Sequence, residues 1–184
     1  SSILAAGADH LLTLFGHSNR EGWTWFEDVL AYDNCRLSEA MIRAGVRLGR
    51  VDVQQCGIET LRWMTALQKA PSGYFRPIGS RTFGKPYLKP HPFDQQPVEV
   101  WAAIDAASAA YDLTGDESWL KEATRAYDWF SGANDRGLAV ADPQTGTSHD
   151  GLNHRGLNLN EGAESVLAYQ HATIAIREFI AKVR

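Results

Sequence analysis

Two pairs of apolar helical segments, each joined by a turn of a few residues, constrain the fold of this chain more than any other feature. Within each segment, apolar residues recur at the spacing of one helix face. Gly49 ends the first segment in the manner of a left-handed C-cap, and Gly115 lies in the turn of the second pair. Two helices joined so closely must pack antiparallel, as a helical hairpin. The four segments cover residues 34–48, 52–69, 97–113 and 117–131.

The two hairpins also form a weak internal repeat. A shift of 66 positions (115 − 49) superimposes Gly49 on Gly115 and Trp63 on Trp129. The repeat predicts a recurring unit of helix, short turn, helix and long loop. In such an array the short turns collect at one end of the helices and the long loops at the other. Residues 1–184 are therefore predicted to form a single all-α domain of antiparallel helical hairpins.

The remaining segments extend this plan. Helices are predicted over residues 3–15 and 161–182, outside the two hairpins. Residues 71–93 and 132–160 are rich in glycine and proline and are predicted to be long loops. Two short strands of a hairpin are predicted within residues 74–83. Long ordered loops are functional more often than structural, so the site is expected on them.

Composition argues against several kinds of partner. The net charge is −4 and no cluster of Lys and Arg forms a basic face, which disfavours nucleic acid and anionic membrane surfaces. No apolar run approaches the roughly 20 residues of a membrane span. The start of the chain lacks both an initiator Met and the charged region of a signal peptide, which indicates a fragment or a processed chain. Phosphate-binding glycine motifs and zinc-ligand spacings are missing, so neither a cofactor nor a metal is predicted.

The two cysteines, Cys35 and Cys56, fall in separate predicted helices. They could form a disulfide only if those helices cross at that point. The favoured interpretation is two small buried thiols in a reducing compartment. A cytoplasmic location is therefore expected.

Three stretches that combine aromatic and polar residues stand out against the helical background. They cover residues 23–34, 93–97 and 149–165. Flat aromatic rings stack on sugar faces, while carboxylates and amides bind hydroxyls or transfer protons. All three stretches belong to the long-loop end of the predicted array. We therefore expect them to meet there and to line a carbohydrate-binding cleft.

Glycoside cleavage needs one carboxyl group to protonate the leaving oxygen and a second to act as base or nucleophile. The candidates for these catalytic roles are Glu27, Asp94, Asp150 and Glu164. The candidates for substrate binding combine two tryptophan stacking platforms with polar side chains. They are Trp23, Trp25, Asp33, Gln95, Gln96, His149, Asn158, Asn160 and Glu161.

Structural roles compete with several of these assignments. Asp33 and Asp94 both lie near the start of a predicted helix and could cap it. Glu161 and Glu164 open the last predicted helix, whose N-terminus favours carboxylates through its partial positive charge. Their spacing of i and i+3 would place them on one helix face. Gly162 between them would let another group approach closely.

Two adjacent pairs of polar residues are ambiguous in the same way. His149 beside Asp150 suggests an acid–base pair, although a turn stabilised by the aspartate and Gly151 explains the pair equally well. The amides of Gln95 and Gln96 are harder to explain by packing. Two amides beside a buried aromatic residue suit bidentate hydrogen bonding to vicinal hydroxyls.

Motifs in these stretches resemble a known family. They are Trp25-Phe-Glu-Asp28, Tyr32-Asp-Asn34, Phe93-Asp-Gln-Gln-Pro-Val-Glu99, Asp150-Gly-Leu152 and Asn160-Glu-Gly-Ala-Glu-Ser165. Together they resemble a bacterial helical module that occurs alone or attached to retaining, nucleotide-sugar-dependent glycosyltransferases. This module falls in the broad group of six-hairpin, (α/α) toroid glycosidase-like proteins. The resemblance covers most of the chain, from about residue 20 to the C-terminus.

The resemblance implies an (α/α) toroid or a partial toroid with its long loops gathered at one end. A complete toroid needs about twice the six or seven helices predicted here. The chain is therefore expected to be the C-terminal part of a larger toroid or of a glycosyltransferase-linked protein, or an open arc that a partner completes.

Three functions follow from these observations. The first is an enzyme that binds a glycan and cleaves or rearranges it by glycoside hydrolase-like acid–base chemistry. The second is a non-catalytic glycan-binding or scaffolding module of an attached glycosyltransferase, whose nucleotide-sugar half this chain lacks. A helical-repeat interaction domain ranks third, because it leaves the clustered acids and amides unexplained.

Overall fold

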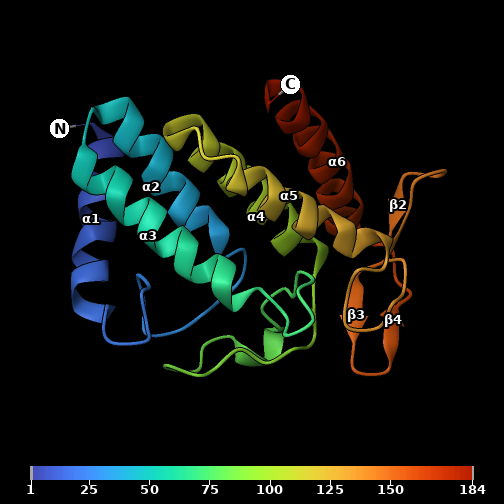
Figure 1. Ribbon diagram of the computed structural model, residues 1–184. Helices are drawn as coiled ribbons and strands as arrows, with labels where there is room; N and C mark the ends of the chain where they lie inside the picture. The colour runs from blue at the N-terminus through green and yellow to red at the C-terminus, as the bar shows by residue number, and fades with distance from the viewer. Residues whose placement is uncertain (1, 184) are drawn as a thin grey trace.

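Six α-helices make up most of residues 2–183, which are the residues that the computed structural model describes (Figure 1). The helices are α1 (Ile3–Ser18), α2 (Cys35–Leu48), α3 (Val51–Leu67), α4 (Pro97–Thr114), α5 (Ser118–Tyr127) and α6 (Ala163–Val183). Two short 3₁₀ helices follow α3 and α5, namely η1 (Ser80–Thr82) and η2 (Asp128–Ser131). The predicted mostly helical class is confirmed for this part of the chain. Pro97 occupies the first turn of α4, where its missing N–H leaves no bond unmade.

Both predicted helical hairpins are present. Helices α2 and α3 pack together on either side of Gly49, and α4 and α5 do so on either side of Gly115. The φ angle is 66° at Gly49 and 67° at Gly115, in the left-handed region that other residues enter with strain. The N–H of Gly115 donates to the carbonyl of Tyr111 at 2.8 Å, which closes the last turn of α4. Glycine therefore lets each helix pair reverse within a few residues.

Helix α4 lies at the centre of the array and packs against α2, α3, α5 and α6, while α1 packs against α2 and α3. The two short turns lie at one end of the helices, at the upper left in Figure 1. The long connections lie at the opposite end, along the bottom and the lower right of the view, where the loop after α3 runs beneath the helices. This segregation is the one that the repeat predicts.

The long connections are anchored by side chains that they contribute to the core. Trp25 and Phe26 from the α1–α2 connection, and Phe75 and Ile78 from the α3–α4 connection, are buried as deeply as helical residues. Burying large apolar side chains contributes about 1.5–3 kcal/mol each to folding. The largest fully buried side chains are Trp25, Trp129, Phe26, Phe75, Phe130, Phe179, Leu30, Met41, Ile42, Leu61, Met64 and Ile78.

The predicted strand hairpin within residues 74–83 is wrong. Phe75 makes a single bridge to Lys69, and η1 occupies the position of the second strand. The backbone N–H groups of this segment pair elsewhere, since Arg76 donates to Gln68 and Ser80 donates to Asp94, each at 2.9 Å. Tertiary partners therefore replaced the local pairing that the residue types favour.

Two small antiparallel hairpins occupy residues 132–160, where only a loop was expected. Strand β1 (Ala141–Asp142) pairs with β2 (Thr147–Ser148), and β3 (Gly151–Asn153) pairs with β4 (Gly156–Asn158). Each strand is too short for an alternating pattern to appear in the sequence. These hairpins lie beyond the first turn of α6, at the right in Figure 1.

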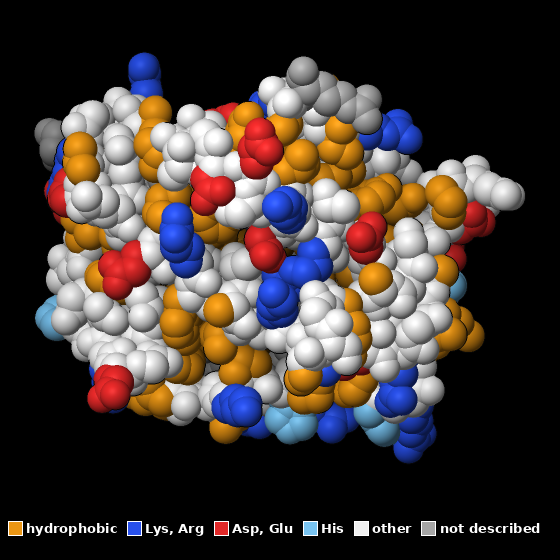
Figure 2. Space-filling model, viewed as in Figure 1, with side chains coloured by type: hydrophobic (Ala, Val, Ile, Leu, Met, Phe, Trp, Pro, Cys, Tyr) orange, Lys and Arg blue, Asp and Glu red, His pale blue; other side chains and the backbone are white. Residues whose placement is uncertain are grey.

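Charged side chains of both signs are interspersed over the face formed by α3 and α5 (Figure 2).

Cys35 and Cys56 are buried free thiols, as predicted. Among the helices of residues 2–183, none combines the length and the apolarity that crossing a lipid bilayer requires.

Candidate functional site

A polar cavity of about 230 Å³ lies between the segment that precedes α4 and the β3–β4 hairpin. It gathers residues from two of the three polar stretches singled out in the sequence. The predicted site residues that line it are Asp94, Gln95, Gln96, Asp150 and Asn158. Ser80, Gly151, Leu152 and Asn153 complete the lining. The long-loop end therefore forms a cavity to which two carboxylates and several amide-bearing residues contribute.

Backbone pairing between Gln95 and Leu152 holds the two sides of this cavity together. The N–H of Gln95 donates to the Leu152 carbonyl at 2.8 Å, and the reverse bond measures 3.0 Å. Gly151 makes this pairing sterically feasible, because a Cβ at this position would lie 1.9 Å from the Gln95 carbonyl oxygen. Its φ of 135° is also one that side-chain-bearing residues rarely adopt.

The side chain of Gln95 is committed to the fold, which corrects the prediction that it binds substrate hydroxyls. Its amide nitrogen donates to the Pro92 carbonyl at 2.7 Å and to Asp135 at 2.6 Å. Its Oε1 accepts a hydrogen bond from the Trp129 indole at 2.7 Å. A buried amide with its donors and acceptor satisfied has little capacity left for a ligand. Gln96 remains the amide available in this segment.

Asp135, which the sequence does not single out, anchors this arrangement. Its carboxylate accepts hydrogen bonds from the Arg76 Nε at 2.9 Å and from the Tyr74 hydroxyl at 2.8 Å, in addition to the Gln95 bond. Burial alone would raise the pKa of Asp135, but the hydrogen bonds from Arg76 and Gln95 outweigh it and lower the pKa. In the sequence, Asp135 follows Asn134 within a predicted loop, and this pair is typical of an ordinary turn. The sequence therefore does not indicate that Asp135 has this role.

Asp150 faces the cavity as an ionised carboxylate. Its Oδ2 accepts a hydrogen bond from the Asn160 side chain, and its Oδ1 accepts one from the Gly162 N–H at 2.7 Å. The Asn160 bond is the main cause that lowers the pKa of Asp150 below its ordinary value. A Cβ at Gly162 would lie 3.0 Å from the aspartate oxygen, so the predicted close approach at this glycine is confirmed. Asn160 therefore acts on the site through Asp150.

Asp94 differs from Asp150 because one of its oxygens is unsatisfied. Its Oδ1 is buried and has no hydrogen-bond partner among residues 2–183. Asp94 does not cap α4, since the cap position is Gln96 and no side chain bonds to the cap. A buried carboxylate oxygen without a donor is unfavourable unless a ligand or water supplies one. Of the two carboxylates that line the cavity, Asp94 is therefore the one whose acceptor capacity the fold leaves unused.

The prediction that Trp23 and Trp25 are exposed stacking platforms is wrong. Their relative exposures are 6% and 1%, and both rings pack against Trp63, at centroid distances of 5.2 and 5.9 Å. The Trp23 indole donates to the carbonyl of Glu27 at 2.7 Å, which folds the segment back on itself. The large apolar area of these rings makes burial more favourable than exposure. Glu27 does not line the polar cavity.

Asp33 does not cap α2 through its side chain, because no side-chain cap bond is present at the start of this helix. Its backbone N–H donates to the Glu99 carboxylate at 2.6 Å, while its own carboxylate lies 3.5 Å from Arg36. Glu99 is fully buried in α4, and burial raises its pKa to about 8. The buried role of Glu99 could not be predicted from the sequence, because a glutamate in the first turn of a helix is common.

Glu161 and Glu164 do not share a helix face, which corrects that expectation. Helix α6 begins after Glu161, at Ala163. Glu164 accepts a hydrogen bond from the Tyr32 hydroxyl at 2.6 Å, whereas Glu161 lies 3.5 Å from His149. His149 and Glu161 line a different cavity from Asp150. The adjacent His149 and Asp150 therefore do not form an acid–base pair.

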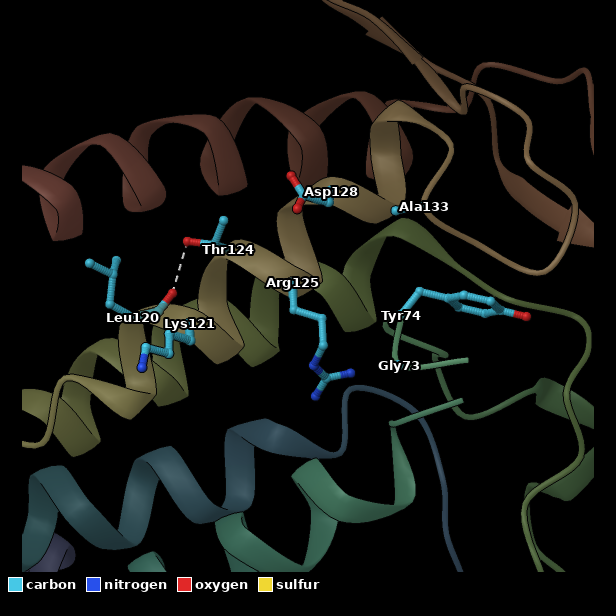
Figure 3. A pocket seen from close by; sticks show the side chains of 8 residues that line it. All are labelled: Gly73, Tyr74, Leu120, Lys121, Thr124, Arg125, Asp128 and Ala133. Atoms are coloured by element: carbon cyan, nitrogen blue, oxygen red, sulfur yellow. Dashed lines mark hydrogen bonds between the residues drawn. The ribbon is translucent and has the colours of Figure 1, made fainter. Parts of the chain in front are cut away.

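A larger cavity, about 500 Å³, lies between α5 and the start of the α3–α4 connection (Figure 3). Its polar groups are mostly engaged elsewhere. Arg125 donates to the Gln68 carbonyl at 2.8 Å, and the Thr124 hydroxyl donates to the Leu120 carbonyl at 2.9 Å. The Tyr74 hydroxyl points away from the cavity, toward Asp135. This cavity is therefore a weaker candidate than the polar one.

Over residues 2–183, no group of three or more His, Cys, Asp or Glu side chains is arranged to hold a metal ion. The sequence matches no protein-family model, and no curated protein is similar to it.

Proposed function

We propose that this chain binds a carbohydrate in the polar cavity between Asp94 and the β3–β4 hairpin. The observation that carries the proposal is a cavity lined by Asp94, whose Oδ1 has no partner among residues 2–183, together with Asp150 and Asn158. Sugar hydroxyls can donate to carboxylates and accept from amides at the same time, so they suit such a mixed lining. The motif resemblance to glycosidase-like modules supports the same substrate class.

The chemistry that we propose is glycoside hydrolase-like, with Asp150 as the ionised partner. Its lowered pKa suits a base or a nucleophile and does not suit a proton donor. The proton donor would then be Asp94, the other carboxyl group of the cavity. Glu27 and Glu164 are weaker candidates because neither lines the cavity.

The second candidate function is a non-catalytic glycan-binding or scaffolding module of an attached glycosyltransferase. The specific observation in its favour is that Gln95 and Asn160 are committed to holding the site rigid. We propose that the helices form an arc of an (α/α) toroid that another segment or chain completes. A cytoplasmic setting is supported by the two free cysteines.

A glycan array followed by product analysis tests both functions. The matched variants are Asp94→Asn, which changes the unpartnered acceptor in the cavity, and Asp28→Asn, an exposed aspartate outside it. We expect Asp94→Asn to weaken binding of any glycan hit by about threefold to tenfold, which corresponds to one hydrogen bond at the carboxyl group. Asp28→Asn should bind like the unchanged chain. Equal affinities of the two variants would refute the proposed site.

Product analysis then separates catalysis from binding. An enzyme should release or rearrange product from the bound glycan, and both Asp94→Asn and Asp150→Asn should abolish turnover. A glycan that stays intact with all three proteins, while binding still depends on Asp94, would assign the second function.

A further inference from the structure

A second cavity of about 350 Å³ lies beside the β1–β2 hairpin, across the backbone from the polar cavity. The N–H of His149 donates to the Val140 carbonyl, whereas the N–H of Asp150 donates to the Asn160 carbonyl. The two adjacent residues are therefore held by different segments. The lining consists of Ala139, Val140, Ala141, Asp142, Pro143, Thr147, His149 and Glu161. The proposed carbohydrate site uses none of these side chains.

His149 lines this cavity and has a ring nitrogen without a hydrogen-bond partner among residues 2–183. Its Nδ1 is buried and makes no hydrogen bond with any of residues 2–183. The Oε1 of Glu161 lies 3.5 Å from this nitrogen, which is too long for a good hydrogen bond. A neutral imidazole with its proton on Nε2 makes Nδ1 an acceptor, like the facing carboxylate oxygen. The Thr147 hydroxyl also lies 3.5 Å from the Glu161 Oε1, at the limit of a hydrogen bond. In this tautomer, two acceptors face each other with no well-placed donor, so a ligand donor would satisfy both.

The charge of the cavity selects a cation. Asp142 and Glu161 contribute two carboxylates, and no Lys or Arg belongs to the lining. Asp142 accepts the Gln144 N–H at 2.8 Å, a turn bond that leaves its negative charge in place. A metal ion fits less well, because no metal-ligating group of three or more His, Cys, Asp or Glu occurs in the described part of the chain.

We infer that this second cavity binds the primary ammonium group of a small ligand, held between Glu161 and His149. An ammonium group carries three donors and no acceptor, so it can donate to the carboxylate and to the imidazole together. Ala139 and Pro143 supply an apolar wall for the carbon body of the ligand. The volume lies in the range of small-molecule sites. An amino sugar and an aliphatic diamine both offer this chemistry.

NMR titration of the ¹⁵N-labelled chain tests this inference. The probes are glucosamine, its neutral counterparts glucose and N-acetylglucosamine, and cadaverine. We expect glucosamine to shift the backbone amides of residues 139–149 and 161, while the two neutral sugars leave them unchanged. Cadaverine has ammonium groups but no sugar ring. If it shifts these amides as much as glucosamine does, the ammonium group alone is sufficient for binding. No shift at these amides with either amine would overturn the inference.

Two variants separate this cavity from the proposed carbohydrate site. Glu161→Gln removes the charge at a half-exposed position and should weaken amine binding by about tenfold or more. Asp94→Asn should leave amine binding unchanged, because Asp94 does not line this cavity. Amine binding that survives Glu161→Gln would refute the site. An unchanged chain that binds the amine but no glycan on the array would refute the proposed function alone.

Discussion

The backbone N–H of Asp33 donates a hydrogen bond of 2.6 Å to the fully buried carboxylate of Glu99 in α4. This bond ties the end of the α1–α2 connection to the central helix. Asn34 and Gln68 add weaker side-chain contacts to the same carboxylate, at 3.4 Å. A carboxyl group in this position is stabilised in its neutral form, because burial dominates its pKa.

Glu99 should therefore make stability depend on pH. Burial raises its folded-state pKa from 4.5 to about 8, so its contribution is complete below pH 4.5 and is lost as the pH rises through 8. Glu99→Gln should flatten the pH dependence of the unfolding free energy across this window. Urea denaturation monitored by circular dichroism at several pH values measures the effect. Exposed Glu117→Gln is the control, and identical pH profiles for the two variants would contradict the prediction.

Gly151→Ala should destabilise the chain and disrupt the polar cavity. The new Cβ would lie 1.9 Å from the Gln95 carbonyl oxygen, at a φ of 135°. We expect a loss of about 2–4 kcal/mol in the unfolding free energy, from steric strain and the broken pairing with Leu152. Gly137→Ala is the matched control, because it has a positive φ but open space around its Cβ. A Gly151 variant as stable as the Gly137 variant would show that the backbones do not approach this closely.

Trp129→Phe should cost about 1–3 kcal/mol in stability, because it leaves the buried Gln95 Oε1 without its donor. Circular dichroism is the appropriate readout, since the substitution removes a fluorophore. Gln95→Met should itself be destabilising, because Pro92 and Asp135 lose their donor. The double variant should lose less than the sum of the two single losses, because the shared hydrogen bond is then counted once. Additive effects of the two substitutions would mean that the hydrogen bond does not couple these residues.

The two thiols should be unreactive in the folded chain. Burial raises the pKa of Cys56 to about 12 and that of Cys35 well above its ordinary value. Because the thiolate is the reactive form, a thiol reagent should label neither cysteine under native conditions and both in denaturant. Rapid labelling of the native chain, measured by mass spectrometry, would contradict their burial.

The helical framework could be predicted from the sequence, and the reason lies in local interactions. Apolar spacing, Pro97 in a first turn, and the turn glycines Gly49 and Gly115 act within a few residues of themselves. Such signals fixed the hairpins and also placed the long loops at one end. Five predicted site residues, including Asp94 and Asp150, met in one cavity for this reason.

The individual roles of the polar residues could not be predicted in the same way. Trp25 and Gln95 have the chemistry of a sugar site, yet both are buried by partners distant in sequence, Trp63 and Trp129. The role of Glu99 could not be predicted either, because the group that hydrogen bonds to its carboxylate belongs to the α1–α2 connection.

The amino-acid sequence by itself determined the helices, their antiparallel pairing and the end at which polar loops gather, because helix periodicity and turn chemistry are local properties. The tertiary structure alone decided which side chains face a cavity and which are satisfied within the fold. Hydrogen-bond partners and burial depend on segments far apart in the chain, so residues of the same type, such as Gln95 and Gln96, have different environments.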